Sequence, residues 1–387
     1  MSFIFANYLL LKRIVIEMIK KFFFTLTMLL TVSVSFAQIS DGYYRLKSAK
    51  TGRYAVVMDN RGSVDVPSTS IDLGAIHSFR DFDGNVVANP GSIIYAHAAG
   101  DGYDLRSQGT STYSMVGYYI KIKESRNNPG TYWAYGTKSG NTIYIGDVNT
   151  TSEEGVLVDN DGHHEWYILP VEADGDNYFG IIPSCEVAGK YYHPFYAAFP
   201  FKCYSGGMKV YYVTKYAADM AVLKEYNGET KPASMPMIIE CSSPESTNNR
   251  LDLFTNSPAV ASDNILTGTY FNNEWPSNHW NRVENDPETI RLLGVTSTGK
   301  LGFVTKTDVD YVPANTAYLK VTPGTAAELR LVSEDEFTAG VSEITVDDEV
   351  NAPSGVYTLT GVKVADDANA NLPAGVYIIN GKKVVVR

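Results

Sequence analysis

The chain contains 387 residues and carries a net charge of −11 at neutral pH, with 32 lysines and arginines against 43 aspartates and glutamates. This acidic balance excludes the basic face that a nucleic-acid-binding protein needs. The length fits two domains and a small tail, and 27 tyrosines with 32 glycines are typical of sheets joined by turns. We therefore expect an all-β protein without a nucleic-acid partner.

The N-terminus has the pattern of an export signal. Lys20 and Lys21 precede an apolar core of about 13 residues, and Ser35-Phe36-Ala37 ends it with small, bulky and small side chains, as signal peptidase requires. The core is too short to cross a bilayer as a helix, which takes roughly 20 residues. The sequence predicts a signal peptide over residues 1–37 and a protein that is secreted or held on the outer cell surface.

A second apolar stretch, broken by Lys12 and Arg13, occupies residues 1–17. Two interpretations stay open for it. Either Met18 is the true start of the protein, or the stretch belongs to an N-terminal membrane anchor. The pattern of the signal itself, from Met18 onward, is the same in both cases.

Residues 40–170 are predicted to form one all-β domain. Asp41–Val57 places alternating strand residues on either side of a Lys-Thr-Gly turn, which is typical of a hairpin. Related strand–turn–strand phrases recur at Gly91–Leu105 and Gly130–Ile145, and this recurrence predicts a threefold repeat.

The phrase GYYRLKSAKTGRY resembles the first repeat of ricin-type β-trefoil lectin modules, and the closing EWYILPV resembles their tryptophan-bearing strand. The resemblance implies a β-trefoil-like fold and, from the sugar-binding members of that family, a lectin activity. The Gln-x-Trp motif of those members is absent here, so no sugar-binding residue carries over by position.

Trp133 and Tyr135 are candidate ligand-binding residues of this domain. In GTYWAYG they stand two positions apart, which places both on one face of a strand. Aromatic rings exposed on such a face stack on sugars, whereas rings on an inward face belong to the core. Both interpretations stay open from the sequence.

Residues 171–335 are predicted to form a β-sandwich. Roughly eight to ten short, turn-bounded strands fill this stretch, as in known sandwiches. The phrases GMKVYYVTK, KPASMPMIIECSS and VPANTAYLKV resemble a β module found in many secreted and surface proteins of the Bacteroidetes. The resemblance implies a compartment and a phylum but no substrate.

A polar loop, Asn272–Pro287, carries Trp275, His279 and Trp280. Two tryptophans in a polar loop are typical of sugar-stacking sites and interface anchors, so these three residues are further ligand-binding candidates. The alternative is that both rings fold back and hold the loop in place. His279 has no carboxylate or second histidine at ligand spacing, so no metal site is predicted.

The three cysteines predict at most one intrachain disulfide, which an exported protein can form. Cys203 and Cys241 each end a strand-like run and are the pair that we expect. Three buried free thiols, with Cys185 as the third, are the alternative.

Residues 342–387 are predicted to be a separate tail, in which an acidic linker, Asp347–Pro353, leads into a small β meander. GVYTLTGVKV and GVYIINGKKVVVR each contain a hairpin, over Thr360-Gly361 and over Asn380-Gly381. This form resembles the C-terminal sorting-type segments of Bacteroidetes proteins exported by type IX secretion, although it is shorter than a full sorting domain. The resemblance implies the secretion machinery as a partner; the alternative is a terminal β meander with no targeting role.

No catalytic constellation is recognisable: the chain lacks a Gly-x-Ser-x-Gly elbow, a His-Glu-x-x-His helix and a phosphate-binding glycine loop. No cofactor is predicted. We expect an exported, surface-displayed binding protein that recognises a glycan or an extracellular host or matrix protein. The alternatives are a structural or accessory surface protein without a small ligand, and a hydrolase that acts on polysaccharide or peptide.

Overall fold

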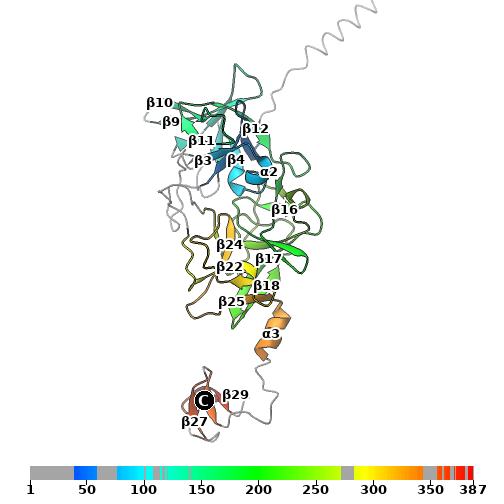
Figure 1. The fold of residues 1–387 in the computed structure, drawn as a ribbon, viewed down its shortest axis with the longest axis vertical. Coiled ribbons are helices and arrows are strands. Elements are labelled where there is room, and N and C mark those ends of the chain that lie inside the picture. The colour runs from blue at the N-terminus through cyan, green and yellow to red at the C-terminus, as the bar shows by residue number, and fades with distance from the viewer. Residues whose placement is uncertain are drawn as a thin grey trace, which may run out of the picture.

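The computed structural model describes residues 39–58, 76–99, 102–107, 114–115, 118–119, 121–138, 141–271, 283–342, 355–359, 361–366, 370, 372–379 and 382–386. Across these residues the protein is nearly all β, as the sequence predicts. Its strands gather in three groups that follow one another along the chain (Figure 1). The helical elements of the described residues are short: α2 (Phe82–Asn85), α3 (Glu334–Ser342) and the 3-10 turns η2 (Pro90–Ser92) and η3 (Ser246–Asn248). None of the helices in this part of the chain has the length and apolar character needed to cross a membrane.

The first domain, residues 39–170, is built from one ten-stranded sheet and one two-stranded sheet. Its strands are β1 (Gly42–Ser48), β2 (Tyr54–Val57), β3 (Ile76–Phe79), β4 (Ile94–Ala99), β5 (Gly102–Arg106), β6 (Ser114–Met115), β7 (Tyr118–Tyr119), β8 (Lys121–Glu124), β9 (Tyr132–Lys138), β10 (Asn141–Asp147), β11 (Glu154–Asp159) and β12 (Glu165–Pro170).

Antiparallel pairing closes β1, β4, β5, β8, β9 and β12 into a ring. The remaining strands form the pairs β2–β3, β6–β7 and β10–β11, each inserted between consecutive ring strands of the sequence. Contacts of β11 with β3, and of β10 with β9, close a second ring on one side of the domain. Closure leaves the ring strands without the free edges that an open sheet would expose.

Alternation along the ring strands decides where the core lies. Successive side chains of a strand point to opposite faces, so every second residue faces the inside of the ring. Trp166 of β12 is fully buried, and its indole Nε1 donates a hydrogen bond to the carbonyl of Ile145 (2.9 Å). The other buried core residues on ring strands are Tyr44, Leu46, Ile94, Ala96, Leu105, Ile122 and Ala134.

The predicted hairpin is confirmed, because β1 and β2 pair at Lys47 and Tyr54 and Gly52 turns the chain with a φ of +75°.

A buried ion pair ties β10 to the turn between β1 and β2. The side chains of Arg53 and Asp147 are both 0% exposed, and Arg53 Nε lies 2.9 Å from Asp147 Oδ2. Asp147 also accepts hydrogen bonds from the hydroxyls of Thr51 and Ser78, while Arg53 donates to the carbonyl of Val148. The extra hydrogen bonds matter because a buried charge pair is tolerated only when its remaining polar atoms are also satisfied.

The second domain, residues 171–342, contains a large sheet and a small one. Its strands are β13 (Phe179–Gly180), β14 (Cys185–Val187), β15 (Lys190–Phe195), β16 (Phe201–Cys203), β17 (Lys209–Ala217), β18 (Met220–Glu225), β19 (Met237–Cys241), β20 (Arg250–Leu253), β21 (Leu266–Thr269), β22 (Ile290–Val295), β23 (Leu301–Val304), β24 (Thr316–Lys320) and β25 (Glu328–Val332). Strands β13, β20 and β16 form the small sheet, and the other ten run in the order β14-β15-β19-β17-β18-β25-β23-β22-β24-β21. Phe179, Phe201 and Leu251 of the small sheet share one buried cluster with Val210 and Ile239 of the large sheet. The two sheets are therefore held together by a common apolar core.

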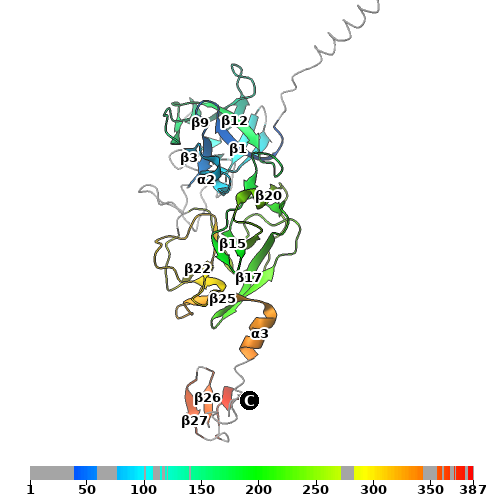
Figure 2. The ribbon, with the colours of Figure 1, turned by 45° about the vertical axis from the view of Figure 1, so that its right-hand side comes forward.

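The fully buried guanidinium of Arg45 lies where the two domains meet. Arg45 Nε donates to Ser92 Oγ (2.9 Å), and Nη1 donates to the carbonyl of Tyr178 (2.9 Å) and to Asn177 Oδ1 (2.9 Å). Nη2 donates to the carbonyl of Val87 (3.2 Å). One side chain of β1 thus joins the loop around η2 to the first residues of the second domain. Figures 1 and 2 both show α2 on the side of the first domain that faces the second.

Aromatic rings enclose this guanidinium in place of carboxylates. The ring of Phe82 lies 5.2 Å from the Arg45 guanidinium carbon and the ring of Phe179 lies 6.0 Å from it. Burial lowers the pKa of Arg45 to about 9, so the group remains charged at neutral pH. Phe271 adds to the contact between the two domains, because it belongs to the second domain and is buried in the core of the first.

The C-terminal unit is a four-stranded sheet of β26 (Val356–Thr358), β27 (Lys363–Ala365), β28 (Gly375–Ile379) and β29 (Lys382–Val386). Both predicted hairpins are confirmed, because β26 pairs with β27 and β28 pairs with β29. The strand order is β27-β26-β28-β29, which corrects the expected meander. A meander would pair β27 with β28, but here β28 pairs with the other edge of β26.

Replacement of Arg45 by methionine is predicted to destabilise the junction. The carbonyls of Val87 and Tyr178 would lose a buried donor, and each buried unsatisfied polar group costs about 1–3 kcal/mol. We expect the free energy of unfolding, measured by urea denaturation, to fall by about 3 kcal/mol or more. Arg80→Met is the matched control, because Arg80 is exposed and pairs with Glu153 at the surface. Equal losses in both variants would contradict the role given to Arg45.

His193 of β15 predicts a pH dependence of stability. Its Nδ1 is buried without a hydrogen-bond partner among the described residues, and burial lowers its pKa to about 4. An unfolded histidine titrates near 6.5, so the unfolded chain takes up the proton first as the pH falls. The stabilisation from neutral His193 is fully present above about pH 6.5 and is lost towards pH 4, by at most about 3 kcal/mol.

Urea denaturation at stepped pH values tests this expectation. His193→Phe is expected to flatten the loss of stability between pH 6.5 and pH 4 relative to the wild type. His97→Phe serves as the control, because His97 is partly exposed beside Asp41, with 2.7 Å between Nδ1 and Oδ2. A wild-type slope in the His193→Phe protein would refute the assignment.

Candidate functional site

Trp133 and Tyr135 lie on the outer face of the ring of the first domain. Between and beside them, Ala134 is buried and Tyr132 packs on the core, so the alternation of β9 turns Trp133 and Tyr135 outward. Both residues are half-buried. The two candidates therefore share one strand face, and that face is the outer one.

Neighbouring strands add two more rings. Tyr144 of β10 stands directly opposite Tyr135 in the strand pairing, with ring centroids 6.5 Å apart. The ring of Trp133 meets Tyr144 edge-on at 6.1 Å, and His164, next to β12, lies 5.8 Å from Tyr144. We call Trp133, Tyr135, Tyr144 and His164 the aromatic patch. Edge-on and offset contacts at these distances are the favourable geometries for aromatic rings.

A carboxylate borders the aromatic patch. Glu165 stands opposite Trp133 in the pairing of β12 with β9. Its Oε1 accepts a hydrogen bond from Ser125 Oγ (2.6 Å) and its Oε2 accepts one from Asn128 Nδ2 (3.2 Å). The hydrogen bond from Ser125, with weaker help from Asn128 and the side chain of Trp133, lowers the pKa of Glu165 against the opposing effect of desolvation. Glu165 is therefore an ionised acceptor at neutral pH.

Two lysines border the other side. Lys123 of β8 is paired opposite Trp133, and Lys121 is paired opposite Tyr135. Directly opposite residues of an antiparallel pair share a face of the sheet. The patch is thus a strip of rings between cationic side chains on β8 and the carboxylate of Glu165 on β12.

One ring of the patch carries an unusual polar atom. Nε2 of His164 is buried and has no hydrogen-bond partner among the described residues. Tyr144 is the most open ring of the set, with 37% of its surface exposed.

The structure does not place the other predicted candidates. Trp275, His279 and Trp280 lie outside the described residues, which stop at Phe271 and resume at Val283. Sequence reasoning missed Tyr144 and His164 as partners of Trp133. The local signal for Tyr144 was the alternation of Ile143, Tyr144 and Ile145, which turns Tyr144 outward. The alternation does not say which strand lies beside β10.

All three cysteines are free thiols in the structure. Cys241 lies in the core of the second domain, and Cys185 and Cys203 pack against the same cluster. Burial raises the pKa of Cys185 to about 11 and that of Cys241 to about 12, so both thiols stay protonated at neutral pH. The disulfide between Cys203 and Cys241 is not formed here and stays a prediction.

Comparisons with known proteins assign no family. No family model, no curated protein and no solved structure matches the chain. Within the described residues no cluster of three or more histidine, cysteine, aspartate or glutamate side chains is arranged to hold a metal ion. The aromatic patch is therefore the feature of the described residues that best indicates a function.

Proposed function

We propose that this protein is an exported, surface-displayed binding protein whose aromatic patch binds a glycan. The observation that carries the proposal is the outward strip of Trp133, Tyr135 and Tyr144 beside the ionised carboxylate of Glu165. Sugar rings offer apolar C–H faces to aromatic side chains and hydroxyls to a carboxylate acceptor. The patch supplies both kinds of partner on one rigid sheet surface, which limits the entropy lost on binding.

We further infer that the first domain is a β-trefoil and the second a β-sandwich. In favour of the first is the closed ring of β1, β4, β5, β8, β9 and β12 with one strand pair inserted in each third of the domain. Two phrases of the predicted repeat, Asp41–Val57 and Gly130–Ile145, begin at the first ring strand of a third, whereas Gly91–Leu105 spans β4 and β5, across the boundary of the first two thirds. In favour of the second is the common core of the large and small sheets. Fold alone carries no function, so the binding proposal stands on the patch.

A hydrolase is less well supported by the same residues. A glycosidase needs one carboxylic acid with a raised pKa to protonate the leaving group. The carboxylate of the patch has the opposite property, because the hydrogen bond from Ser125 lowers the pKa of Glu165. Glu165 is suited to accept hydrogen bonds and not to donate a proton at neutral pH.

A second function, contact with another protein, is favoured by the C-terminal unit. Several of its apolar side chains are strongly exposed, among them Leu359, Val362 and Val385 at 60% or more. Leu359 and Val362 lie in the β26–β27 connection and Val385 lies on β29, so large apolar side chains are exposed at both ends of the strand order. Exposed apolar surface of this kind marks interaction sites. We propose that this unit contacts the secretion machinery and that the protein reaches the outer surface, in accord with the signal predicted over residues 1–37.

Binding is tested on a glycan array with the full purified chain. We expect a saturable signal that falls at least about tenfold in Trp133→Ala and in Tyr144→Ala, because one base- or sugar-sized stacking contact is worth about 1–3 kcal/mol. Tyr204→Ala is the matched control, since Tyr204 is 54% exposed on the second domain. A blank array, or variants that bind like the wild type, would argue against a glycan site on the patch.

Display is tested on intact cells of the source organism. Removal of residues 355–387 is expected to abolish cleavage of the protein by an added protease, while the protein still accumulates behind the outer surface. The loss is expected because the exposed apolar residues of the C-terminal unit would no longer meet the export machinery. Full protease sensitivity of the truncated chain would show that the unit has no part in display.

A further inference from the structure

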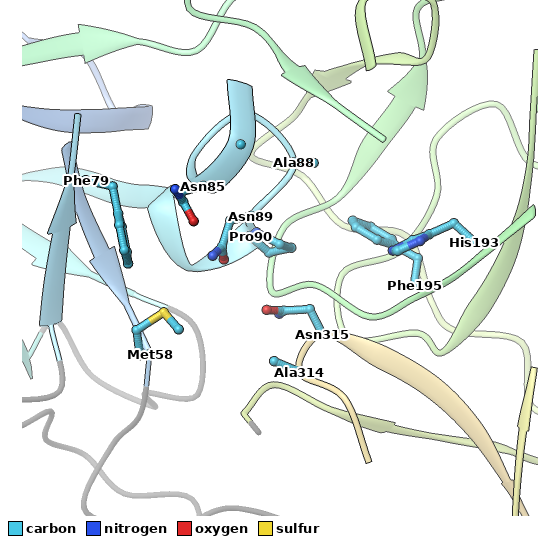
Figure 3. Close-up of a pocket in the computed structure, with 11 residues that line it drawn as sticks. Met58, Phe79, Asn85, Ala88, Asn89, Pro90, His193, Phe195, Ala314 and Asn315 are labelled. Atoms are coloured by element: carbon cyan, nitrogen blue, oxygen red, sulfur yellow. The ribbon is translucent and has the colours of Figure 1, made fainter. Parts of the chain in front are cut away.

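A cavity of about 270 Å³ lies between the two domains. Figure 3 shows Phe79, Asn85 and Asn89 of the first domain on one side of it and Phe195, His193 and Asn315 of the second on the other. The volume lies just below the range for ligand sites, about 300–1,000 Å³. It suits a molecule of one or two sugar rings and is distinct from the aromatic patch on β9, β10 and β12.

Side-chain amides are the polar groups of this cavity. Asn85 is the last residue of α2, and Asn89 caps η2 with its Oδ1, which accepts from the Gly91 amide (2.9 Å). Asn315 takes a φ of +52°, and its Nδ2 donates to the carbonyl of Tyr196 (3.1 Å). That hydrogen bond fixes the amide, which points toward Asn89 and Pro90 across the cavity in Figure 3.

The remaining walls are apolar or neutral. The rings of Phe79 and Phe195 and the side chain of Met58 contribute the apolar part. His193 is neutral at physiological pH, because burial lowers its pKa to about 4. None of the described residues that line the cavity is an aspartate, glutamate, lysine or arginine. An ion would find no opposite charge in this cavity and would lose hydration on entering it, so the lining selects against charged ligands.

We propose that this interdomain cavity binds a neutral, hydroxyl-rich ligand of one or two sugar rings. An amide both donates and accepts, which matches a hydroxyl, and the phenyl rings match the apolar face of a sugar ring. Residues of both domains line the cavity, so a bound ligand contacts both. A ligand that binds only the folded state stabilises that state, by an amount that rises with the logarithm of the ratio of ligand concentration to dissociation constant. The ligand therefore also acts as a link between the domains.

The proposal is tested with the full chain and a panel of neutral saccharides: glucose, galactose, mannose, N-acetylglucosamine and their β-linked disaccharides. Saturation-transfer NMR and the melting temperature are measured at millimolar concentrations. We expect at least one saccharide to give a saturable signal and to raise the melting temperature. Absence of any saturable signal across the panel overturns the proposal.

Variants place the binding site. Asn85→Ala removes an amide at a helix end, and Ala314→Trp inserts an indole into the cavity from an exposed position of its lining. Both are expected to weaken binding at least about tenfold, while Ala259→Trp, on another exposed position of the second domain, leaves it unchanged. Wild-type affinity in both cavity variants overturns the proposal. Trp133→Ala distinguishes the cavity from the aromatic patch. If Trp133→Ala loses saccharide binding while Ala314→Trp keeps it in full, the saccharide binds at the aromatic patch alone.

Discussion

The structure depends on a charge that is buried without an opposite charge. Arg45 is satisfied by carbonyl and side-chain oxygens of two separate segments, the loop around η2 and residues 177–178, and is flanked by the rings of Phe82 and Phe179. Such a guanidinium holds its neighbours in place, because any movement that breaks a hydrogen bond leaves a buried polar group unpaired. The position of the second domain on the first is therefore set by hydrogen bonding as well as by apolar contact.

The hydrogen bonds of Arg45 also hold the residues that line the cavity between the domains. The loop between α2 and η2, which carries Asn85 and Asn89, is the loop whose Val87 carbonyl accepts from Arg45. On the other side, β15 belongs to the large sheet of the second domain, and Asn315 directly precedes β24 of the same sheet. A buried side chain that fixes the junction thus also fixes the two walls of the cavity. Preorganised walls lower the entropic cost of binding a small ligand.

The aromatic patch depends on a different principle, the period of a strand. Inward residues of β9 and β12, such as Ala134 and Trp166, make the core, so the residues that alternate with them face outward. Trp133 and Tyr144 meet because two antiparallel strands are in register, and Glu165 joins them through a third strand. A closed ring holds this register firmly, which suits a surface that must present rings in fixed positions.

The all-β class, the hairpins and the shared face of Trp133 and Tyr135 follow from the sequence by itself. Each depends on local rules: period-two alternation, turn residues and the fixed spacing of neighbouring side chains. Tertiary structure alone decided which strands close the ring, which placed Tyr144 and His164 beside Trp133. It also decided the strand order of the C-terminal unit and the partners of Arg45, which lie 47 and 132 residues away at Ser92 and Asn177. Contacts at such separations depend on how whole sheets pack, and no local pattern encodes them.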